Sequence, residues 1–397
     1  MTILENAENR HVANVTYGKA MTKTQKIILA ILSVTAVILV GAMGYYILAF
    51  ASKPLGPALP VAQQTLPPLW TATPGDPSAG LVTLVPTISF ATNTPAPLCG
   101  GPSTMTILAI GQDQRSNNYD YGLGDIVRVV RVDFVTPKIT VLEFPRDLWV
   151  EIPYIADNLN GLDHGKLNQA YLYGQPGDGF AYWDDPSQGP GLLSLTLNLN
   201  FGVQADHYLA VNMRTFENVI NAIDGITINV PDIETANNTG LTVGRHYLNG
   251  AQALKVARNR QQGMFQRVSN QNLVLCAMRE KVLSPSIVKQ IPALIESFRD
   301  NVQTDFTPEQ LSQLACLGTK LPVKNIAFAS FPQELLTEDI RIFDDPDFPK
   351  GLLVTQADFS ILRQYVTRFN AGTWPSLPAS ISIETAPEEE TSSSFCP

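Results

Sequence analysis

The chain has few cysteines, few histidines and fewer basic than acidic residues. Its 27 lysines and arginines against 36 aspartates and glutamates leave a net charge of −9. This balance argues against broad nucleic-acid binding, which depends on many cationic contacts to phosphates. The four cysteines show no CxxC spacing, and His164, His207 and His246 are scattered, so neither residue type predicts a metal cluster. A nucleophile elbow, a Walker loop, a GxGxxG run and a recognisable DNA-reading helix are also missing, so any phosphate chemistry must use a local basic pocket.

Charged residues are absent from 27–50, an apolar run of 24 residues that would span roughly 36 Å as a helix. This length predicts a transmembrane helix, and the basic residues ahead of it predict that 1–26 form a cytoplasmic tail. A cleaved signal peptide is the alternative, although Ala49-Phe50-Ala51 matches a cleavage site only loosely. We expect a single-pass protein of the cell membrane with its main domain outside the cytoplasm.

Prolines, threonines and alanines dominate residues 51–98, which excludes regular helix and sheet there. This segment is either an extended stalk or a linker of no particular reach. Residues 99–372 alternate strand-like and helix-like patterns, which favours one α/β domain. The remaining residues, 373–397, form an acidic, serine-rich tail that we expect to be mobile.

Hydrophobic periodicity predicts the elements of this domain. The expected strands are Thr106–Ile110, Ile126–Phe134, Ile139–Phe144, His207–Val211, Ile226–Val230 and Asn325–Ala329. The expected helices are Leu192–Leu199, Met213–Ile223, Gly250–Asn259, Val268–Leu283, Ile287–Phe298, Pro308–Leu317 and Gln356–Phe369. Thr307, Pro308 and Gln310 form a typical helix start, with a capping threonine and proline in the first position.

Charged residues follow or open three of these strands. Asp113 and Arg115 leave the first strand, Asp125 opens the second, and Arg146 and Asp147 leave the third. If the strands are neighbours, these side chains converge on one edge of the sheet, where α/β proteins bind ligands. Carboxylates with arginines suit Mg²⁺ together with a phosphate, and ordinary surface salt bridges are the competing interpretation.

Two further patterns each allow a functional and a structural interpretation. Arg258, Arg260 and Arg267 are dense for an acidic chain, and they could form an anion site or a solvated basic face. The apolar run Leu192–Leu199 could line a lipid groove, but such a run is more often core.

Together these segments resemble the LytR-CpsA-Psr family of membrane-anchored cell-wall enzymes. The resemblance rests on the order and spacing of motifs rather than on any one of them. The matching segments are Asp113-Gln114-Arg115, Asp125, Phe144-Pro145-Arg146-Asp147, Lys166-Leu167-Asn168-Gln169-Ala170, Asp206-His207-Tyr208, Asp224-Gly225-Ile226-Thr227, and Leu248-Asn249-Gly250 through Arg258-Asn259-Arg260.

The resemblance implies a three-layer α/β/α domain with a mostly mixed central sheet. It implies a Mg²⁺-dependent phosphotransferase that moves a glycopolymer from a polyprenyl-pyrophosphate lipid to a hydroxyl of the cell wall, in cell-wall biogenesis. The implied metal ligands are Asp113 and Asp125. The implied pyrophosphate-binding residues are Arg115, Arg146, Arg258, Arg260, Arg267 and Gln271, of which Arg115, Arg146 and Arg267 would also act in catalysis. The lipid tail would occupy an apolar tunnel, to which Leu192–Leu199 could contribute.

The chain departs from the family pattern at three positions. Leu123 replaces an arginine, Met264 replaces an aspartate and Asn270 replaces a second arginine. Methionine cannot accept a proton, so a non-catalytic binder of lipid pyrophosphate or envelope glycan is the alternative, and a polyprenyl-pyrophosphate hydrolase is a third possibility. Arg128 or Arg131 could compensate, but alternation along a strand allows at most one of them to face the site.

The four cysteines allow three pairings if the domain lies in an oxidising compartment. We expect disulfides Cys99–Cys396 and Cys276–Cys316, the first of which would join the tail to the sheet.

Overall fold

The structure is a computed structural model that describes residues 38, 52–60, 95–115, 119–177, 179–259, 264–284, 287, 290, 293, 301–341, 351–375 and 393–395. Of 264–266 and 393–395 only the backbone is described. The segments expected at 1–26, 27–50 and 373–397 therefore lie largely outside the described residues, as does the helix expected at Ile287–Phe298. The chain forms two compact units, Met1–Lys53 and Pro54–Pro397, and nearly all described residues belong to the second. Within the described part, no helix combines the length and apolarity needed to cross a membrane.

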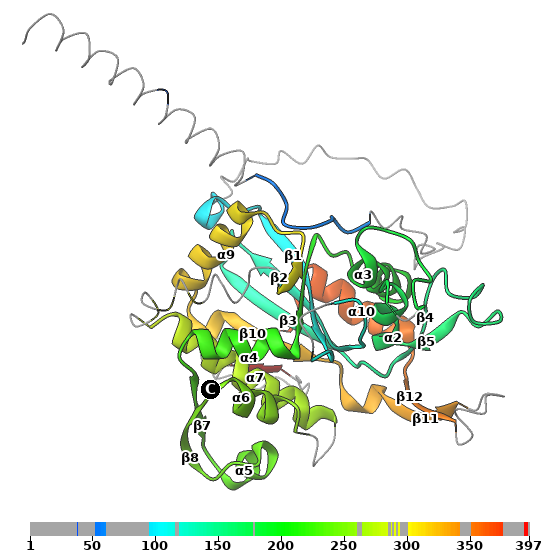
Figure 1. The fold of residues 1–397 in the computed structure, drawn as a ribbon. Helices are drawn as coiled ribbons and strands as arrows, with labels where there is room; N and C mark the ends of the chain where they lie inside the picture. Colours follow the sequence, from blue (N-terminus) through cyan, green and yellow to red (C-terminus); the bar gives the residue numbers. More distant parts are fainter. Residues whose placement is uncertain are drawn as a thin grey trace, which may run out of the picture. The chain divides into compact units, whose positions relative to one another are not determined.

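A seven-stranded mixed sheet lies at the centre of the second unit, in the order β13-β10-β3-β2-β1-β6-β9 (Figure 1). Its strands are β1 (Thr104–Gln112), β2 (Gly124–Asp133), β3 (Lys138–Phe144), β6 (His207–Asn212), β9 (Val302–Thr304), β10 (Ile326–Ser330) and β13 (Ser393–Phe395). Strand β2 pairs antiparallel with both β1 and β3, whereas β1 pairs parallel with β6 and β3 pairs parallel with β10. The expected mixed sheet is confirmed, and this topology brings the ends of β1 and β3 and the start of β2 to one edge.

Three helices pack on one face of the sheet. They are α2 (Leu167–Tyr173), α3 (Gln188–Phe201) and α10 (Phe359–Asn370). Alternate strand residues such as Val127, Val129 and Leu142 point into this layer and are fully buried against them. The two-stranded sheets β4 (Trp149–Glu151) with β5 (His164–Lys166) and β11 (Thr337–Arg341) with β12 (Leu352–Gln356) extend this side of the unit.

The opposite face is covered by a second set of elements. These are α4 (Met213–Ala222), α5 (Ile233–Thr239), α6 (Gly250–Ala257), α7 (Met264–Val282), α9 (Pro308–Lys320) and the hairpin of β7 (Ile226–Val230) with β8 (Gly244–Leu248). Ile107, Phe134, Phe306 and Leu317 form a core between the sheet and α9, whereas the helices α4, α6 and α7 share a separate core with the hairpin. A third cluster joins Val141, Ile326 and Phe328 to Leu321, so the second face has several separate cores among the described residues.

Most expected elements are present, with shifted ends. The helix start at Thr307 is confirmed, because the Thr307 hydroxyl accepts the Gln310 N–H and Pro308 occupies the first helical position. Helix α7 begins at Met264 rather than near Val268. The sequence did not predict the elements α2, α5, β4, β5, β8, β9, β11, β12 and β13.

Within the proline-rich segment, residues 54–60 pack on the domain. The Leu55 N–H donates to the Phe306 carbonyl at 3.0 Å, and Leu59 packs on the core of the first face. A Cβ at Gly56 would lie 2.6 Å from the Thr304 carbonyl oxygen, so only glycine allows the backbone to approach this closely.

The expected cysteine pairing is wrong. Cys99 bonds to Cys316, and the bridge joins the 3₁₀ turn Leu98–Gly100 before β1 to helix α9. Cys276 is also disulfide-bonded, and its partner lies outside the described residues. The sequence alone could not identify the correct one of the three pairings, because the pairing depends on how α9 packs beside the start of β1.

We expect the double variant Cys99→Ser, Cys316→Ser to unfold more easily. The bridge spans 217 residues, and releasing a long loop in the unfolded chain typically costs about 2–4 kcal/mol of stability. Urea unfolding followed by circular dichroism measures the change, with the surface variant Thr319→Ser on α9 as a control. An unchanged midpoint for the double variant would contradict this expectation.

Candidate active site

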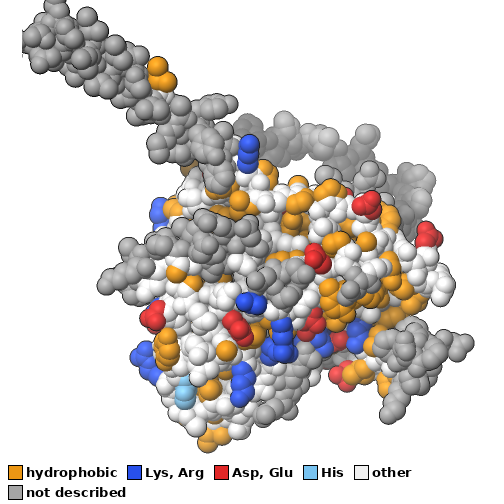
Figure 2. Space-filling view, viewed as in Figure 1, with side chains coloured by type: hydrophobic (Ala, Val, Ile, Leu, Met, Phe, Trp, Pro, Cys, Tyr) orange, Lys and Arg blue, Asp and Glu red, His pale blue; other side chains and the backbone are white. Residues whose placement is uncertain are grey.

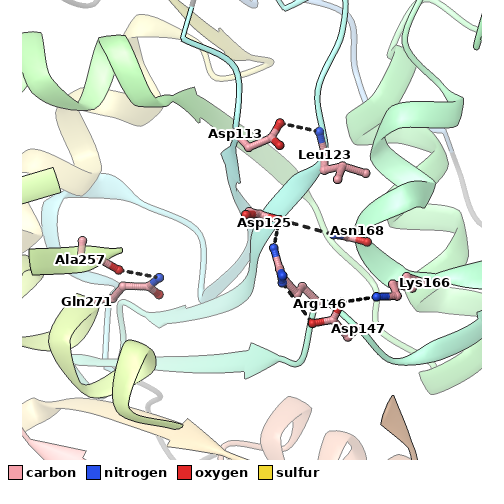
Figure 3. Close-up of polar contacts among 9 residues, drawn as sticks. All are labelled: Asp113, Leu123, Asp125, Arg146, Asp147, Lys166, Asn168, Ala257 and Gln271. Atoms are coloured by element: carbon pink, nitrogen blue, oxygen red, sulfur yellow. Dashed lines mark hydrogen bonds and ion pairs between the residues drawn. The ribbon is translucent and has the colours of Figure 1, made fainter. Parts of the chain in front are cut away.

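Four charged residues meet at the sheet edge where β1 and β3 end and β2 begins. Asp113 follows β1, Asp125 is the second residue of β2, and Arg146 and Asp147 follow β3. The Arg146 NH1 lies 2.5 Å from the Asp125 Oδ1 (Figure 3). The expected convergence is confirmed for Asp113, Asp125, Arg146 and Asp147 but not for Arg115. It follows from the antiparallel pairing of β2 with both neighbours.

Arg146 is held by carboxylates on two sides. Its Nε lies 3.1 Å from the Asp147 Oδ2, and the Lys166 ammonium lies 2.9 Å from the other Asp147 oxygen. The Asn168 amide is 3.4 Å from the Asp125 Oδ1. Burial opposes the charge on Arg146, but Asp125 and Asp147 outweigh it and raise its pKa. The guanidinium is therefore charged and oriented before any ligand arrives.

The folded protein disfavours the charged form of Asp113. Its Oδ1 accepts the Leu123 N–H at 2.8 Å, which holds the loop between β1 and β2. Burial raises the pKa of Asp113, and the negative charge of Asp125 raises it further. Two neighbouring carboxylates are a suitable oxygen pair for a divalent cation. The described residues contain no group of three or more His, Cys, Asp or Glu side chains arranged to hold a metal.

Helices α6 and α7 bring further site residues to one cavity. Arg258, at the end of α6, lines this cavity together with Asp125, Arg267 and Gln271. Arg115 does not line it. It lies instead in an adjoining hollow of about 1040 Å³ that Arg258 also lines. Arg260 is outside the described residues, so its expected role remains a prediction.

The cavity has a volume of about 320 Å³ and mostly apolar walls. Its apolar lining includes Ala109, Ile126, Leu209, Val211, Phe216, Val219, Leu254, Val274, Leu275 and Met278. Strand β1 lines the cavity with the small residues Ala109 and Gly111, together with Ile110 and Gln112. A Cβ added to Gly111 would lie 2.9 Å from the Ile126 side chain, so the strand accepts no larger residue there without a shift.

The run Leu192–Leu199 does not line this cavity, so the structure confirms the core interpretation of this run and not its contribution to a lipid tunnel. It belongs to α3 on the opposite face of the sheet, where Leu192, Leu193 and Leu197 are fully buried in the core. Periodicity cannot separate these outcomes, because a groove and a core demand the same apolar residues.

Arg128 is a buried site residue to which the sequence assigned no definite role. It is 4% exposed and lines the cavity, whereas Arg131 faces the other side and donates to the Asn370 carbonyl at 3.1 Å. Of these two arginines, Arg128 alone lines the cavity, as the alternation of side chains along a strand requires. The sequence could have predicted its ion-pair partner. The tight turn after β2 sets the register of β2 and β3, and this register places Arg128 opposite Glu143.

Two of the departures from the family pattern lie on α7. Asn270 is 2% exposed, and its amide donates to the Asn238 carbonyl at 2.8 Å, toward α5. Met264 is the first residue of α7, and its side chain is outside the described residues. Helix α7 therefore turns Arg267 and Gln271, but not Asn270, toward the cavity.

The described residues thus form a mixed α/β domain with carboxylates and guanidiniums at one sheet edge, beside an apolar cavity. The comparison with family models identifies the class of protein: the model of the LytR_cpsA_psr family matches residues 92–345, and the chain belongs to this family.

Characterised relatives support this assignment. The chain is 30% identical over 213 residues to a protein of Oceanobacillus iheyensis named polyisoprenyl-teichoic acid–peptidoglycan teichoic acid transferase TagU, covering 53% of this chain and 61% of that protein. The chain thus spans less than two thirds of that relative. It is 28% identical over 247 residues to the regulatory protein MsrR of Staphylococcus aureus, covering 61% of this chain and 68% of that protein.

Solved structures show the same fold. A structure of TagT bound to LIIa-WTA matches with a TM-score of 0.51 and 19% identity, covering 68% of this chain and 90% of that chain. The crystal structure of B. subtilis TagV matches with a TM-score of 0.51 and 21% identity, covering 69% of this chain and 99% of that chain. At this level of identity, both establish the fold alone.

We expect Asp113→Asn to stabilise the protein at neutral pH in the absence of divalent cations. Because folding raises the pKa of Asp113 above 3.8, its stability contribution is present below that value and is lost as the pH rises through the folded pKa. Asparagine keeps the acceptor for the Leu123 N–H without the charge. Thermal unfolding in EDTA from pH 3.5 to 7.5 should show a gain that grows with pH.

Asp358 provides a control of opposite sign. Its hydrogen bonds from Ser360 lower its pKa, so Asp358→Asn should lose stability at pH 7 and approach the wild type at acid pH. An Asp113→Asn variant that is no more stable than the wild type at pH 7 would contradict the electrostatic account of the site.

Proposed function

We propose that the protein is a phosphotransferase that moves a glycopolymer from a polyprenyl-pyrophosphate lipid to a hydroxyl of the cell wall. The observation that carries this proposal is that Asp125, which forms an ion pair with Arg146 at the charged edge, lines the apolar cavity together with Arg258 and Arg267. A pyrophosphate needs the guanidiniums, and a prenyl chain needs the apolar walls. The name of the TagU relative, a teichoic acid transferase, supports this class of reaction.

The proposed reaction is a single phosphoryl displacement. The acceptor hydroxyl oxygen attacks the phosphorus that carries the glycopolymer, and a phosphodiester forms between glycopolymer and acceptor. The bond from that phosphorus to the bridging oxygen breaks, polyprenyl phosphate leaves, and the hydroxyl proton is released. Arg146, Arg258 and Arg267 hold the pyrophosphate and stabilise the charge that develops on its oxygens. Arg115, in the adjoining hollow, contacts the glycopolymer side of the donor.

The carboxylate pair fits the Mg²⁺ that the family resemblance implies. Asp113 and Asp125 would hold the ion, since their charges lie close enough to interact and Mg²⁺ takes one or two carboxylates in its shell. When bound, Mg²⁺ would neutralise the charge of a phosphoryl oxygen. Asp113 also holds the Leu123 N–H, which keeps its carboxylate oriented before the ion arrives.

We also propose that residues 27–50 anchor the protein in the cell membrane and that the catalytic unit lies outside the cytoplasm. A membrane anchor is consistent with a donor that is itself a membrane lipid. The acceptor is then a glycan of the cell wall or envelope.

Arg146→Ala should lower the transfer rate by about 10²–10³, the usual loss when a preorganised donor to a developing oxyanion is removed. The assay uses the full chain in detergent with a polyprenyl-pyrophosphate disaccharide and peptidoglycan fragments, in Mg²⁺ or EDTA, and it follows both the transferred product and free phosphate. Arg368→Ala, an exposed arginine on α10, serves as the control. Transfer that survives Arg146→Ala unchanged would overturn the assigned role.

The same assay separates the two alternative functions. The replacement of an acidic residue by Met264 favours a non-catalytic binder, which would bind the donor in an Arg146-dependent way without releasing product. A hydrolase would release phosphate with no product on the acceptor. Either result would replace the transferase proposal.

Ala109→Phe should weaken binding of prenyl pyrophosphates by at least about tenfold while leaving the affinity for inorganic pyrophosphate unchanged. The added ring would fill the cavity at the position where β1 leaves space, and the charged edge would keep its arrangement. Isothermal titration with geranylgeranyl pyrophosphate and with pyrophosphate measures both affinities. Ala371→Phe, at the exposed end of α10, is the matched control, and equal losses for both ligands would place the prenyl chain elsewhere.

A further inference from the structure

Arg128 is a buried guanidinium on the sheet side of the apolar cavity, and the mechanism above gives it no role. It lies on β2, is 4% exposed, and lines the same cavity as Asp125, Arg267 and Gln271. A buried charge is costly unless its hydrogen bonds are made, so its presence in an apolar cavity requires an explanation.

The ion pair and the hydrogen bond that Arg128 makes in the described part of the chain both involve the same nitrogen, NH2. Its NH2 lies 2.6 Å from the Glu143 Oε2 and 3.0 Å from the Gln271 Oε1. Within the described part of the chain, its Nε and NH1 have no hydrogen-bond partner, and the contact with Glu143 is an ion pair without hydrogen-bond geometry. Two buried nitrogens of a residue that lines the cavity therefore lack a hydrogen-bond partner in the described part of the chain, which is unusual for a buried donor.

The guanidinium is held in place from two elements. Glu143 stands directly opposite Arg128 in the pairing of β2 with β3. Gln271 comes from α7, and its amide nitrogen lies 3.4 Å from the Ala257 carbonyl, which orients its oxygen toward Arg128. Sheet and helix together position the group without any contribution from a ligand.

Helix α7 gives the cavity little cationic charge of its own. Arg267 lines the cavity, whereas the Asn270 side chain donates to the Asn238 carbonyl at 2.8 Å and is not among the lining residues. Arg128 adds a guanidinium from the sheet beside the one that α7 provides.

We infer that Arg128 is a phosphate-binding residue of the donor site. Its free Nε–H and NH1–H donate to a phosphate oxygen of a prenyl pyrophosphate whose chain lies in the cavity. This inference rests on the proposed function for the class of ligand, and it adds a residue that lies on the sheet rather than at the charged edge. Glu143 then has a defined effect, because its negative charge competes with the phosphate for the same guanidinium.

The test compares three variants of the full chain in detergent, with geranyl pyrophosphate as the probe and geraniol as the uncharged control. Arg128→Met with Glu143→Met replaces the pair by side chains of similar length, an exchange that usually preserves folding. This double variant should bind geranyl pyrophosphate roughly 10- to 100-fold more weakly, because it loses two hydrogen bonds to a charged group. Glu143→Gln keeps Arg128 and removes the competing charge, so it should bind the probe roughly three- to tenfold more tightly. Arg131→Met, three residues along β2 on the other face, should leave the affinity unchanged.

A purely structural ion pair gives a different pattern. In that case the double variant keeps its affinity and Glu143→Gln binds no more tightly, which would overturn the inference while wild-type transfer leaves the proposed function intact. Should the double variant fail to fold in thermal unfolding, the Glu143→Gln affinity alone decides. Failure of the wild type to bind geranyl pyrophosphate at all would overturn both the inference and the donor site on which it rests.

Discussion

The ion pair between Arg146 and Asp125 connects the parts of the site. Asp125 is on β2 and Arg146 follows β3, so the pair exists only in the observed register of these strands. A slip by one residue would move Asp125 to the other face of the sheet. Lys166 and Asn168 extend the network to β5 and α2, which pack on the face away from the cavity. The sheet and the layer on its first face thereby hold one guanidinium.

The two faces of the sheet differ in how densely side chains pack against them. On one face Phe144 packs between Phe201 and Phe331, with ring centroids 5.1 and 5.3 Å apart, and the core is continuous. On the other face the small side of β1 leaves a cavity between the sheet and α4, α6 and α7. A cavity forgoes the contacts that would fill it, so this face contributes less to stability than its area suggests. At the edge between the two faces, burial and the charge of Asp125 raise the pKa of Asp113, so the charged carboxylate opposes folding there.

Much of the site could be predicted because polar residues interrupt apolar strands. Asp113, Asp125 and Arg146 each stand where an apolar run stops, and the antiparallel pairing of neighbouring strands then brings them together. The cavity could not be predicted, because it depends on which face of the sheet each apolar run covers, and Leu192–Leu199 illustrates the failure. The pairing of Cys99 with Cys316 depends in the same way on helix packing rather than on local sequence. Arg128 lay within reach of prediction, since its partner Glu143 follows from the turn between β2 and β3 alone.

The attachment of residues 54–60 changes what the proline-rich segment can do. Leu55 is hydrogen-bonded to the carbonyl that follows β9, and Pro95 already belongs to the domain that begins at β1, so the chain between Pro60 and Pro95 is closed at both ends on one body. A closed segment of this kind is a loop and not a spacer. A change in the length of residues 61–94 would therefore not alter how far this unit can lie from the residues ahead of Pro54.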